Sequence, residues 1–544
     1  MALSGQVPPL LAGALYQLAL GNSAVHAPAP SPDAIPKAVL WPEGLERFKG
    51  GRILHTRTPG RALAGAPNCI ELHELVRAES MVGAWMNFYI PEFDFLAPLL
   101  PIAVDGASPH RWRSVPLHVS GDINGDPLRN LACTRAGVPV PDRALSGKDK
   151  HDDVARELHD LWRAVAGPNW QAVYPRGAGC VHTKAFVVRY PGFVLVVITS
   201  ANAMRGDMEL LDNHWFVQSF PKLPAPQRGS PPTDFEQRLF AHMETLGCPP
   251  SFLDQLRGKY DFRATDDRVH LVPSTPRVKG PNTCDDFGAF RLNALARRLI
   301  PREERHDVQL EFCCGSVGPL HEEGAQAWMK RMDRLLRGRN PQRAVEVDVD
   351  ALDLPRWRIV FPTSATVNAC EDDVRAIASN IGCCIRSSDW QSASAEVRSL
   401  FHDYQSKDFG RLFHEKSILW LRPSPPPSTT APSTAAGDTP TGPPPPPPPP
   451  YMAYFGSHNL SKAAWGEPAL VPGKGDRSPS RKLSPGANNF ELGVVVRGED
   501  LVSMLEDEGA SSWEDVVTYV TPARPYRSGE RAWNSNAWVR EAES

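Results

Sequence analysis

The feature that most constrains this chain is a short pattern of residues that occurs twice along it. The stretch "VHTKAFVVRY" places His182 two residues before Lys184, and "LFHEKSILWLRP" places His414 two residues before Lys416. Apolar β-formers follow each pair, which predicts that both pairs lead into strands. Because residues two apart in a strand project from the same side, each His should point the same way as its Lys. One such pair alone carries little weight, since both residue types are common.

Each pair is followed by an asparagine at a related distance. Asn202, in "VVITSANAM", lies 20 residues beyond His182, and Asn459, in "YFGSHNLSKAAW", lies 45 residues beyond His414. Residues 423–450 are rich in proline and can form only extended or irregular structure, so they predict an insertion. Without those 28 residues the second distance becomes 17. The chain is therefore expected to contain two similar halves.

The repeat and the local patterns together indicate an α/β fold with two similar domains, each a mixed sheet flanked by helices, related by a pseudo-two-fold axis. We expect a flexible segment at 1–45, a first domain at 46–266, and a second domain at 267–544 that carries the insertion at 423–450. Strands are predicted at 81–90, 114–120, 184–190, 193–201, 268–274, 307–316 and 356–364, and helices at 152–166, 287–299 and 324–339.

Composition limits the functions that such a fold can serve. The formal net charge is −3, so a site for a polyanion has to be a local basic patch. The ten cysteines include no pair with zinc-ribbon spacing, which favours reduced thiols and provides no metal site. A run of about 18 apolar residues does not occur, so no membrane-spanning segment is expected.

The residue types of the repeat suggest a chemistry. Two His, two Lys and two Asn that meet where the halves join would form a phosphate site. Lys supplies positive charge to the non-bridging oxygens, and the Asn amides donate hydrogen bonds to them. Because an unperturbed imidazole has a pKa of about 6.5, one ring can act as a neutral nucleophile while the other acts as an acid. The pair could then catalyse a two-step displacement without a metal.

Paired His-Lys motifs at a domain interface resemble those of the phospholipase D superfamily. Ordinary members carry an Asp five residues after the Lys, and here Arg189 and Leu421 occupy those positions. That departure, together with "GSHNLSKAAWG" and "NNFELGVVV", is similar to the tyrosyl-DNA phosphodiesterase family, which removes topoisomerase I peptides from DNA 3′ ends. The stretches "VHTK", "STPRVKG", "FGAFRLNALAR" and "CGSVGPL" also match. The resemblance extends roughly from Gly51 to Tyr526 and implies two phospholipase D-like domains.

The resemblance also implies roles for the six residues of the repeat. His182 would be the nucleophile, and His414 would be the general acid that afterwards activates water. The remaining four residues would bind the phosphate: Lys184, Lys416, Asn202 and Asn459.

Four further positions follow from the same resemblance. Glu491, in "FELG", would orient the imidazole of His182, and Asn213, eleven residues after the first Asn, would hold the other imidazole. Ser316 and the nearby backbone N–H groups of "CGSVG" would contact DNA phosphates. Ala178 stands where the family has a Phe, so this chain lacks that aromatic contact with DNA.

The function implied is that of a DNA-repair hydrolase, a nuclease-like or exonuclease-like phosphodiesterase that leaves a 3′-phosphate through a covalent phosphohistidine. Its partners would be single- or double-stranded DNA with blocked 3′ ends and a topoisomerase I peptide. Neither a cofactor nor a metal is implied, and we expect a monomer without membrane contact that works in the nucleus. Two alternatives stay open: another phospholipase D-type phosphodiesterase acting on nucleic acid or phospholipid, and an inactive protein that binds DNA ends.

Overall fold

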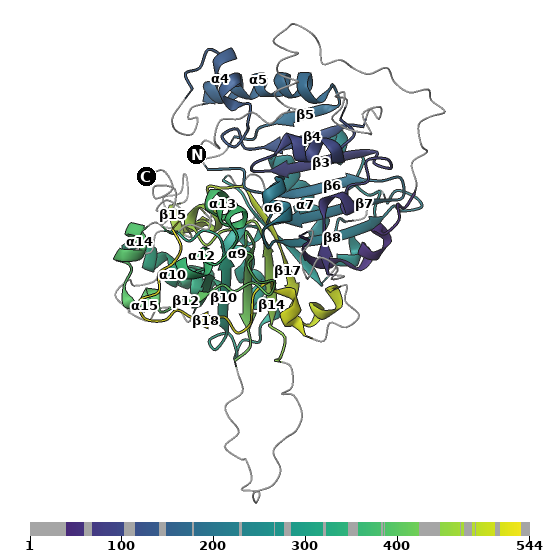
Figure 1. Cartoon of the computed structure of the whole chain (residues 1–544). Coiled ribbons are helices and arrows are strands. Elements are labelled where there is room, and N and C mark those ends of the chain that lie inside the picture. Colours follow the sequence, from purple (N-terminus) through teal and green to yellow (C-terminus); the bar gives the residue numbers. More distant parts are fainter. Residues whose placement is uncertain are drawn as a thin grey trace, which may run out of the picture.

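The computed structural model describes residues 40–58, 68–102, 115–140, 148–176, 179–227, 231–265, 267–276, 284–318, 323–345, 357–381, 385, 387–423, 447–467, 469–472, 481–484, 486–505 and 512–534. Most of the predicted N-terminal segment (residues 1–39) and residues 424–446 of the predicted insertion lie outside these ranges. The described elements form two large sheets and a small two-stranded one, with helices around them (Figure 1).

The first large sheet has the strand order β2-β1-β8-β7-β6-β3-β4-β5. Its strands are β1 (Arg52–Thr56), β2 (Cys69–Ile70), β3 (Gly83–Phe88), β4 (Leu117–Gly121), β5 (Trp170–Val173), β6 (Ala185–Arg189), β7 (Phe193–Thr199) and β8 (His214–Pro221). The accompanying helices are α2 (Leu72–Leu75), α3 (Phe93–Leu96), α4 (Arg129–Arg135), α5 (Lys148–Ala166), α6 (Arg205–Glu209), α7 (Asp234–Thr245) and α8 (Pro250–Leu253).

The second large sheet has the order β18-β12-β11-β10-β13-β14-β17-β9. Its strands are β9 (Val269–Ser274), β10 (Gln309–Cys314), β11 (Trp357–Phe361), β12 (Phe401–Asp403), β13 (Lys416–Leu421), β14 (Met452–Gly456), β17 (Glu491–Arg497) and β18 (Arg524–Pro525); β15 (Ala469–Pro472) and β16 (Arg481–Ser484) pair separately. The helices are α9 (Gly288–Leu299), α10 (Glu323–Leu336), α11 (Pro341–Val345), α12 (Ser364–Asn368), α13 (Asp372–Ile381), α14 (Ser387–Ser392), α15 (Ala395–Arg398) and α16 (Lys462–Trp465).

The two sheets repeat one topology, as the sequence predicts. Strands β5-β4-β3-β6-β7-β8-β1 correspond in spatial order to β12-β11-β10-β13-β14-β17-β9. In each series the first three strands are parallel and the remaining pairs are antiparallel. The predicted α/β fold with two similar mixed sheets is therefore confirmed.

The strands and helices expected from local patterns are all present, with shifted ends. The two β-rich runs around the "PG" turn form the hairpin β6–β7, in which Tyr190 N–H donates to the Phe193 carbonyl at 2.9 Å. Side chains of β7 alternate between two cores, because successive residues of a strand face opposite sides of the sheet. Val194 and Val196 pack in one core, and Leu195 packs in the other.

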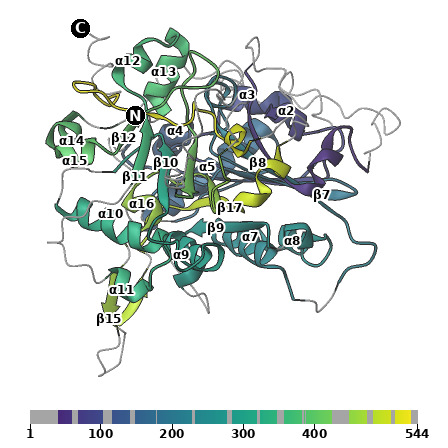
Figure 2. The same ribbon diagram turned by 90° about the horizontal axis from the view of Figure 1, so that it is seen from below.

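The predicted division near residue 266 falls between the sheets, since β8 ends at Pro221 and β9 begins at Val269. The hydrophobic core does not divide there. One continuous core contains Val196 of β7, Leu239 of α7 and Leu271 of β9. Figure 2 shows α7 and α9 along the same side of the molecule, next to β9. The two halves are thus joined by a shared core, which gives the interface between them a fixed geometry.

Candidate active site

The two His-x-Lys stretches enter equivalent strands, β6 and β13, and each is attached to the opposite half of the chain. The backbone N–H of His182 donates to the carbonyl of Phe490 at 2.9 Å, and that of His414 donates to the carbonyl of Asp212 at 2.9 Å. An isolated β-bridge lies beside each of these hydrogen bonds. Because the arrangement is reciprocal, both histidines lie at the junction of the halves.

The imidazole of His182 is held by a carboxylate from the second half. Its Nδ1 lies 2.8 Å from Oε2 of Glu491, which has no exposed surface. Ser457 Oγ donates to the same oxygen at 2.5 Å, and Asn489 Nδ2 donates to Oε1 at 3.1 Å. Burial opposes ionisation of Glu491, but His182, His458 and Lys184 together outweigh it and lower the pKa of the carboxyl. Glu491 therefore lies where the sequence analysis expects it.

The imidazole of His414 is held by a carboxylate that the sequence analysis did not identify. Its Nδ1 lies 2.9 Å from Oδ2 and 3.2 Å from Oδ1 of Asp207, which is fully buried in α6. Burial opposes ionisation of this carboxyl too, but His414, Lys416 and the backbone N–H of Asn202 together outweigh it and lower the pKa of Asp207. Each imidazole is thus paired with a carboxylate from the other half of the chain.

The expected contact between Asn213 and the second imidazole is absent, and Asp207 takes that place. Asn213 lies on the far side of Asp207 from His414, and its Nδ2 donates to Oδ1 of Asp207 at 3.1 Å. The physical reason is the length of the Asn213 side chain. Asn213 accepts from Ser200 as Glu491 accepts from Ser457 in the other half, but its side chain is one methylene shorter, and the carboxylate of Asp207 lies between it and the ring.

The two lysines lie inside the site beside their own histidines. Lys184 Nζ donates to the carbonyl of His182 at 2.8 Å, and Lys416 Nζ donates to the carbonyl of His414. Both are buried, which is costly for a charge unless other charges compensate it. Burial lowers the pKa of Lys184 to about 8, although Glu491 opposes that shift. Two lysines and two carboxylates balance one another in the interior.

Electrostatic coupling shows that these groups form one site. Burial is the main cause that lowers the pKa of both His182 and His414, with the paired carboxylates opposing it. Lys416 contributes to the lowering at His182, and Lys184 contributes at His414. The pKa of each imidazole is therefore affected by the lysine of the other half. The lowered pKa of each ring favours the neutral imidazole, and Nδ1 of each ring lies beside a carboxylate.

The asparagines of the repeat lie at the ends of the strands that follow. Asn202 comes after β7 and Asn459 after β14, and each has a buried side-chain Oδ1 without a hydrogen-bond partner among the described residues. The loop of Ser316 runs beside the second of them, because Gly318 N–H donates to the carbonyl of Leu460 at 2.9 Å. The unpaired atom is an acceptor, so the contact of either amide with a phosphate oxygen has to come from its Nδ2.

An aromatic side chain that the sequence analysis missed also borders the site. The ring of Tyr89 lies 5.4 Å from the ring of His182, and Lys184 Nζ lies 5.7 Å from the Tyr89 centroid. Tyr89 follows β3, the strand that pairs with β6, so sheet order brings it there. Ala178, where the family has its Phe, lies outside the described residues.

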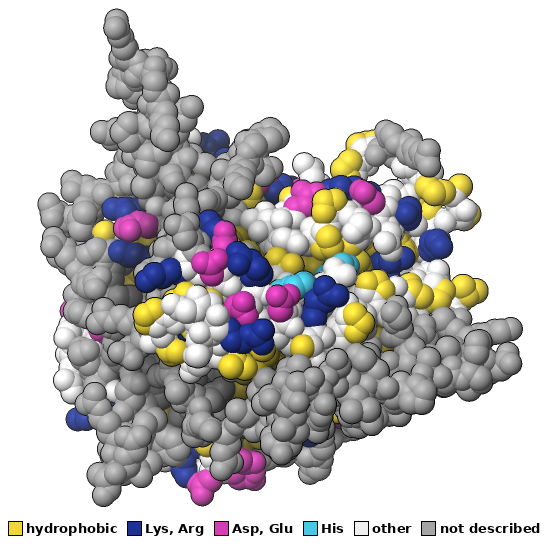
Figure 3. All heavy atoms as spheres, turned by 90° about the horizontal axis from the view of Figure 1, so that it is seen from above, with side chains coloured by type: hydrophobic (Ala, Val, Ile, Leu, Met, Phe, Trp, Pro, Cys, Tyr) yellow, Lys and Arg dark blue, Asp and Glu magenta, His cyan; other side chains and the backbone are white. Residues whose placement is uncertain are grey.

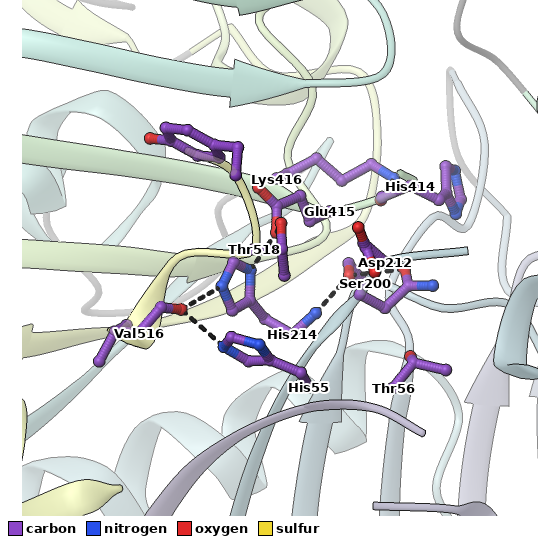
Figure 4. A network of polar contacts seen from close by, with 12 residues as sticks. His55, Thr56, Ser200, Asp212, His214, His414, Glu415, Lys416, Val516 and Thr518 are labelled. Atoms are coloured by element: carbon purple, nitrogen blue, oxygen red, sulfur yellow. Dashed lines mark hydrogen bonds and ion pairs between the residues drawn. The ribbon is translucent and has the colours of Figure 1, made fainter. Parts of the chain in front are cut away.

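The side chain between the second His and Lys points away from the site. Figure 4 shows Lys416 reaching toward His414, while Glu415 faces Thr518 and His214. Thr518 Oγ1 donates to Oε2 of Glu415 at 2.6 Å, and His214 Nδ1 lies 3.1 Å from the same oxygen. This buried network fixes the start of β13, so that residues 414 and 416 share one side as the strand pattern predicts.

Three observations bear on other kinds of site. Within the described residues, no three His, Cys, Asp or Glu side chains are grouped so as to hold a metal ion. No helix in the described part of the chain is long and apolar enough to span a bilayer. On the described surface seen from above, basic and acidic side chains are interspersed (Figure 3). That face, as far as it is described, presents no uniformly basic patch.

Comparison with known proteins bears on the whole arrangement. Residues 145–527, more than half of the 544-residue chain, match the family model described as tyrosyl-DNA phosphodiesterase. The structure of yeast tyrosyl-DNA phosphodiesterase is similar, with 14% identity and a TM-score of 0.55 over 89% of this chain and 99% of that chain. A His-to-Asn variant of the yeast enzyme gives 14% identity and a TM-score of 0.56 over 89% and 100% of the two chains. No curated protein matches in sequence.

Proposed function

The chain belongs to the tyrosyl-DNA phosphodiesterase family, and from that premise we propose that it hydrolyses the bond between a DNA 3′-phosphate and a tyrosine side chain. Membership makes the chain a phosphodiester hydrolase of the DNA-repair type. The proposal adds a topoisomerase I peptide as the adduct, blocked 3′ ends of single- or double-stranded DNA as the substrate, a monomeric enzyme and nuclear residence. It also adds a covalent phosphohistidine intermediate.

One observation carries the proposal: two imidazoles from different halves lie at the junction of the halves, and the pKa of each is affected by both Lys184 and Lys416. Nδ1 of each ring contacts a buried carboxylate, and within the described residues no hydrogen bond is formed to Nε2 of either ring. Lys184 and Lys416 supply the charge that a phosphodiester needs. The site is therefore suited to phosphoryl transfer from an oxygen to a nitrogen and then to water.

In the first step, the lone pair on Nε2 of His182 attacks phosphorus and forms an N–P bond. The bond between phosphorus and the tyrosine oxygen breaks, and His414 transfers its Nε2 proton to that oxygen. A phenol has a pKa of about 10, so its departure needs only modest acid assistance. The Nδ1 proton of His182 stays in the hydrogen bond to Glu491, whose negative charge offsets the positive charge that develops on the ring.

In the second step, His414 is neutral and accepts a proton from a water molecule. The oxygen of that water attacks phosphorus, the N–P bond breaks, and His182 recovers its lone pair. The products are a DNA 3′-phosphate and free enzyme, and His414 has regained the proton that it gave up.

The charge balance of the site explains how His414 becomes protonated. In the free protein the two lysines balance Glu491 and Asp207, and both imidazoles are neutral. A bound phosphodiester adds one negative charge, which favours the protonated form of a nearby imidazole. Asp207 already stabilises a positive charge on His414, so proton uptake there accompanies substrate binding.

Two alternative functions would need different features of this site. Another phospholipase D-type phosphodiesterase would use the same site, but the Asp that ordinary members carry is replaced by Arg189 and Leu421. An inactive DNA-end binder would need no paired imidazoles with free Nε2 atoms. Both alternatives are therefore less well supported by this site.

The proposed function is tested with an oligonucleotide that carries a 3′-phosphotyrosine, incubated with the protein in excess EDTA. We expect release of tyrosine and a 3′-phosphate, because the two buried lysines supply the charge stabilisation without a metal. Phosphatidylcholine vesicles under the same conditions should not be hydrolysed. Activity that is lost in chelator and restored by Mg²⁺ or Zn²⁺, or hydrolysis of phospholipid alone, would contradict the proposal.

A further inference from the structure

We propose that Asp207 is the positioning residue for His414: it fixes which nitrogen of the ring carries the proton and stabilises the ring when it becomes positive. This proposal rests on the proposed function and assigns a role to a residue outside the sequence repeat. The resemblance places a neutral amide 11 residues after the first Asn. That residue, Asn213, forms no hydrogen bond with the ring of His414 in this chain.

Two neighbours of the Asp207 carboxyl are fixed hydrogen-bond donors, and the third is a ring nitrogen of His414. The backbone N–H of Asn202 donates to Oδ2 at 2.5 Å, Asn213 Nδ2 donates to Oδ1 at 3.1 Å, and His414 Nδ1 lies 2.9 Å from Oδ2. Burial opposes ionisation, but His414, Lys416 and the N–H of Asn202 together outweigh it and lower the pKa of Asp207. This arrangement favours a negative charge at this point.

The direction of the hydrogen bonds behind Asp207 is fixed by a backbone group. The carbonyl of Asp207 can only accept, and Asn213 Nδ2 donates to it at 2.8 Å. Asn213 Oδ1 therefore faces Ser200 Oγ, which donates to it at 2.8 Å and accepts from the N–H of His214 at 3.2 Å. Oδ1 of Asp207 thus accepts from Asn213, and an ionised Oδ2 accepts from His414, with the proton on Nδ1 of that imidazole.

The other half of the molecule contains the same relay with one member fewer. The backbone N–H of Leu492 donates to Ser457 Oγ at 3.0 Å, and Ser457 Oγ donates directly to Glu491. Ser200 and Ser457 are thus equivalent, and Asn213 is the counterpart of Glu491. In the second half, Glu491 itself supplies the carboxylate at this position. In the first half, Asn213 occupies the position, and Asp207 lies between it and the imidazole of His414.

Helix α6 holds Asp207 in place at the junction of the halves. Figure 1 shows α6 there, beside α13 of the second half. A Cβ on Gly206 would lie 2.3 Å from Cδ1 of Ile377, so a larger residue at 206 would require the Ile377 side chain or one of the helices to shift. The close packing of α6 on α13 supports the position of Asp207 beside His414.

Asp207 serves both proposed steps through His414. With the proton fixed on Nδ1, Nε2 is the nitrogen that exchanges a proton with the leaving oxygen and with water. The negative charge stabilises the imidazolium, so the ring can be protonated when the phosphodiester is bound. An amide at this position would keep a hydrogen bond but lose the charge, and the acid step would then need a lower pH.

The test compares Asp207→Asn with the exchanged pair Asp207→Asn, Asn213→Asp in single-turnover cleavage of a 3′-phosphotyrosyl oligonucleotide. The exchanged pair keeps one amide and one carboxylate but moves the charge one hydrogen bond away from His414. Cleavage needs protonated His414 and so falls as pH rises through its pKa. We expect that fall to move about one unit or more to lower pH in both variants, with cleavage at pH 7 slowed about 10²-fold in Asp207→Asn.

Asp126→Asn is the matched control. Asp126 is another buried carboxylate that accepts three hydrogen bonds, from Leu128 N–H, Trp162 Nε1 and Tyr174 Oη. This variant should lose thermal stability while its pH profile stays unchanged. If Asp207→Asn keeps the wild-type rate and profile, or if the exchanged pair restores both, contact of the charge with His414 is unnecessary and the proposal is wrong.

A spectroscopic readout separates this proposal from the proposed function. A ring N–H proton hydrogen-bonded to a buried carboxylate should give a downfield proton resonance that is absent in both His414→Asn and Asp207→Asn. Should the wild-type protein show this resonance yet fail to cleave phosphotyrosyl DNA, the proposed function falls while the His414–Asp207 pair stands. Persistence of the resonance in Asp207→Asn would contradict the hydrogen bond between His414 and Asp207.

Discussion

Replacing His182 by alanine is expected to lower turnover of 3′-phosphotyrosyl DNA by at least about 10⁴-fold, because the group that attacks phosphorus is removed. Two neighbouring groups are poorly suited to replace it. His414 has the role of the acid and is hydrogen-bonded to Asp207, and burial raises the pKa of the Cys180 thiol, which disfavours the thiolate. Single-turnover cleavage of a labelled oligonucleotide measures the loss.

The control for His182→Ala is His118→Gln, a change to a buried histidine on β4 that packs against Phe252. That variant should turn over within a few-fold of wild type. A His182→Ala protein that retains a tenth or more of wild-type activity, with an unchanged melting temperature, would remove His182 from the role of nucleophile.

Replacing Lys184 or Lys416 by alanine is expected to slow the chemical step by roughly 10²–10³-fold, the usual effect of removing one preorganised charge-stabilising group. Both ammonium groups are buried, so the lost charge is not replaced by solvent. Methionine variants at the same positions keep most of the side-chain volume and should show the same loss. The measurement is the single-turnover rate at saturating enzyme, which separates chemistry from binding.

Lys150→Ala, which removes an exposed lysine from α5, is the matched control and should leave the rate unchanged. Methionine variants with wild-type rates would show that the volume of the side chain matters and its charge does not. That result would contradict the proposed phosphate contact for either lysine.

The sequence was most informative where the two halves repeat. Two His-x-Lys pairs, each followed by an Asn, are enough to predict a pseudo-two-fold arrangement, and the equivalent strands β6 and β13 have that relation. Glu491 could be located because it begins a strand and matches a specific motif. Spacing, strand pattern and motif all describe local properties of the chain, and these residues occupy corresponding places in both halves.

The residues that were missed depend on contacts between segments that the repeat does not relate. Asp207 lies on a short helix of the first half, and Ala464, five residues after Asn459, is its formal counterpart. No pattern comparison could single it out. Tyr89 reaches His182 only because β3 is the neighbour of β6, and strand order is not encoded by spacing.

The central claim is a covalent bond between His182 and the 3′-phosphate, and the variant His414→Asn tests it most directly. A phenolate can leave slowly without an acid, whereas water attacks poorly without a base, so hydrolysis of the intermediate should be slowed more than its formation. We predict that His414→Asn accumulates a protein–DNA adduct on a 3′-phosphotyrosyl oligonucleotide. The adduct should be visible as a shift on a denaturing gel, labile in acid as a phosphoramidate, and absent when His182→Ala is added. An adduct trapped by His182→Ala instead would reverse the assignment of the two histidines, and absence of any adduct in His414→Asn during measurable turnover would contradict the covalent mechanism.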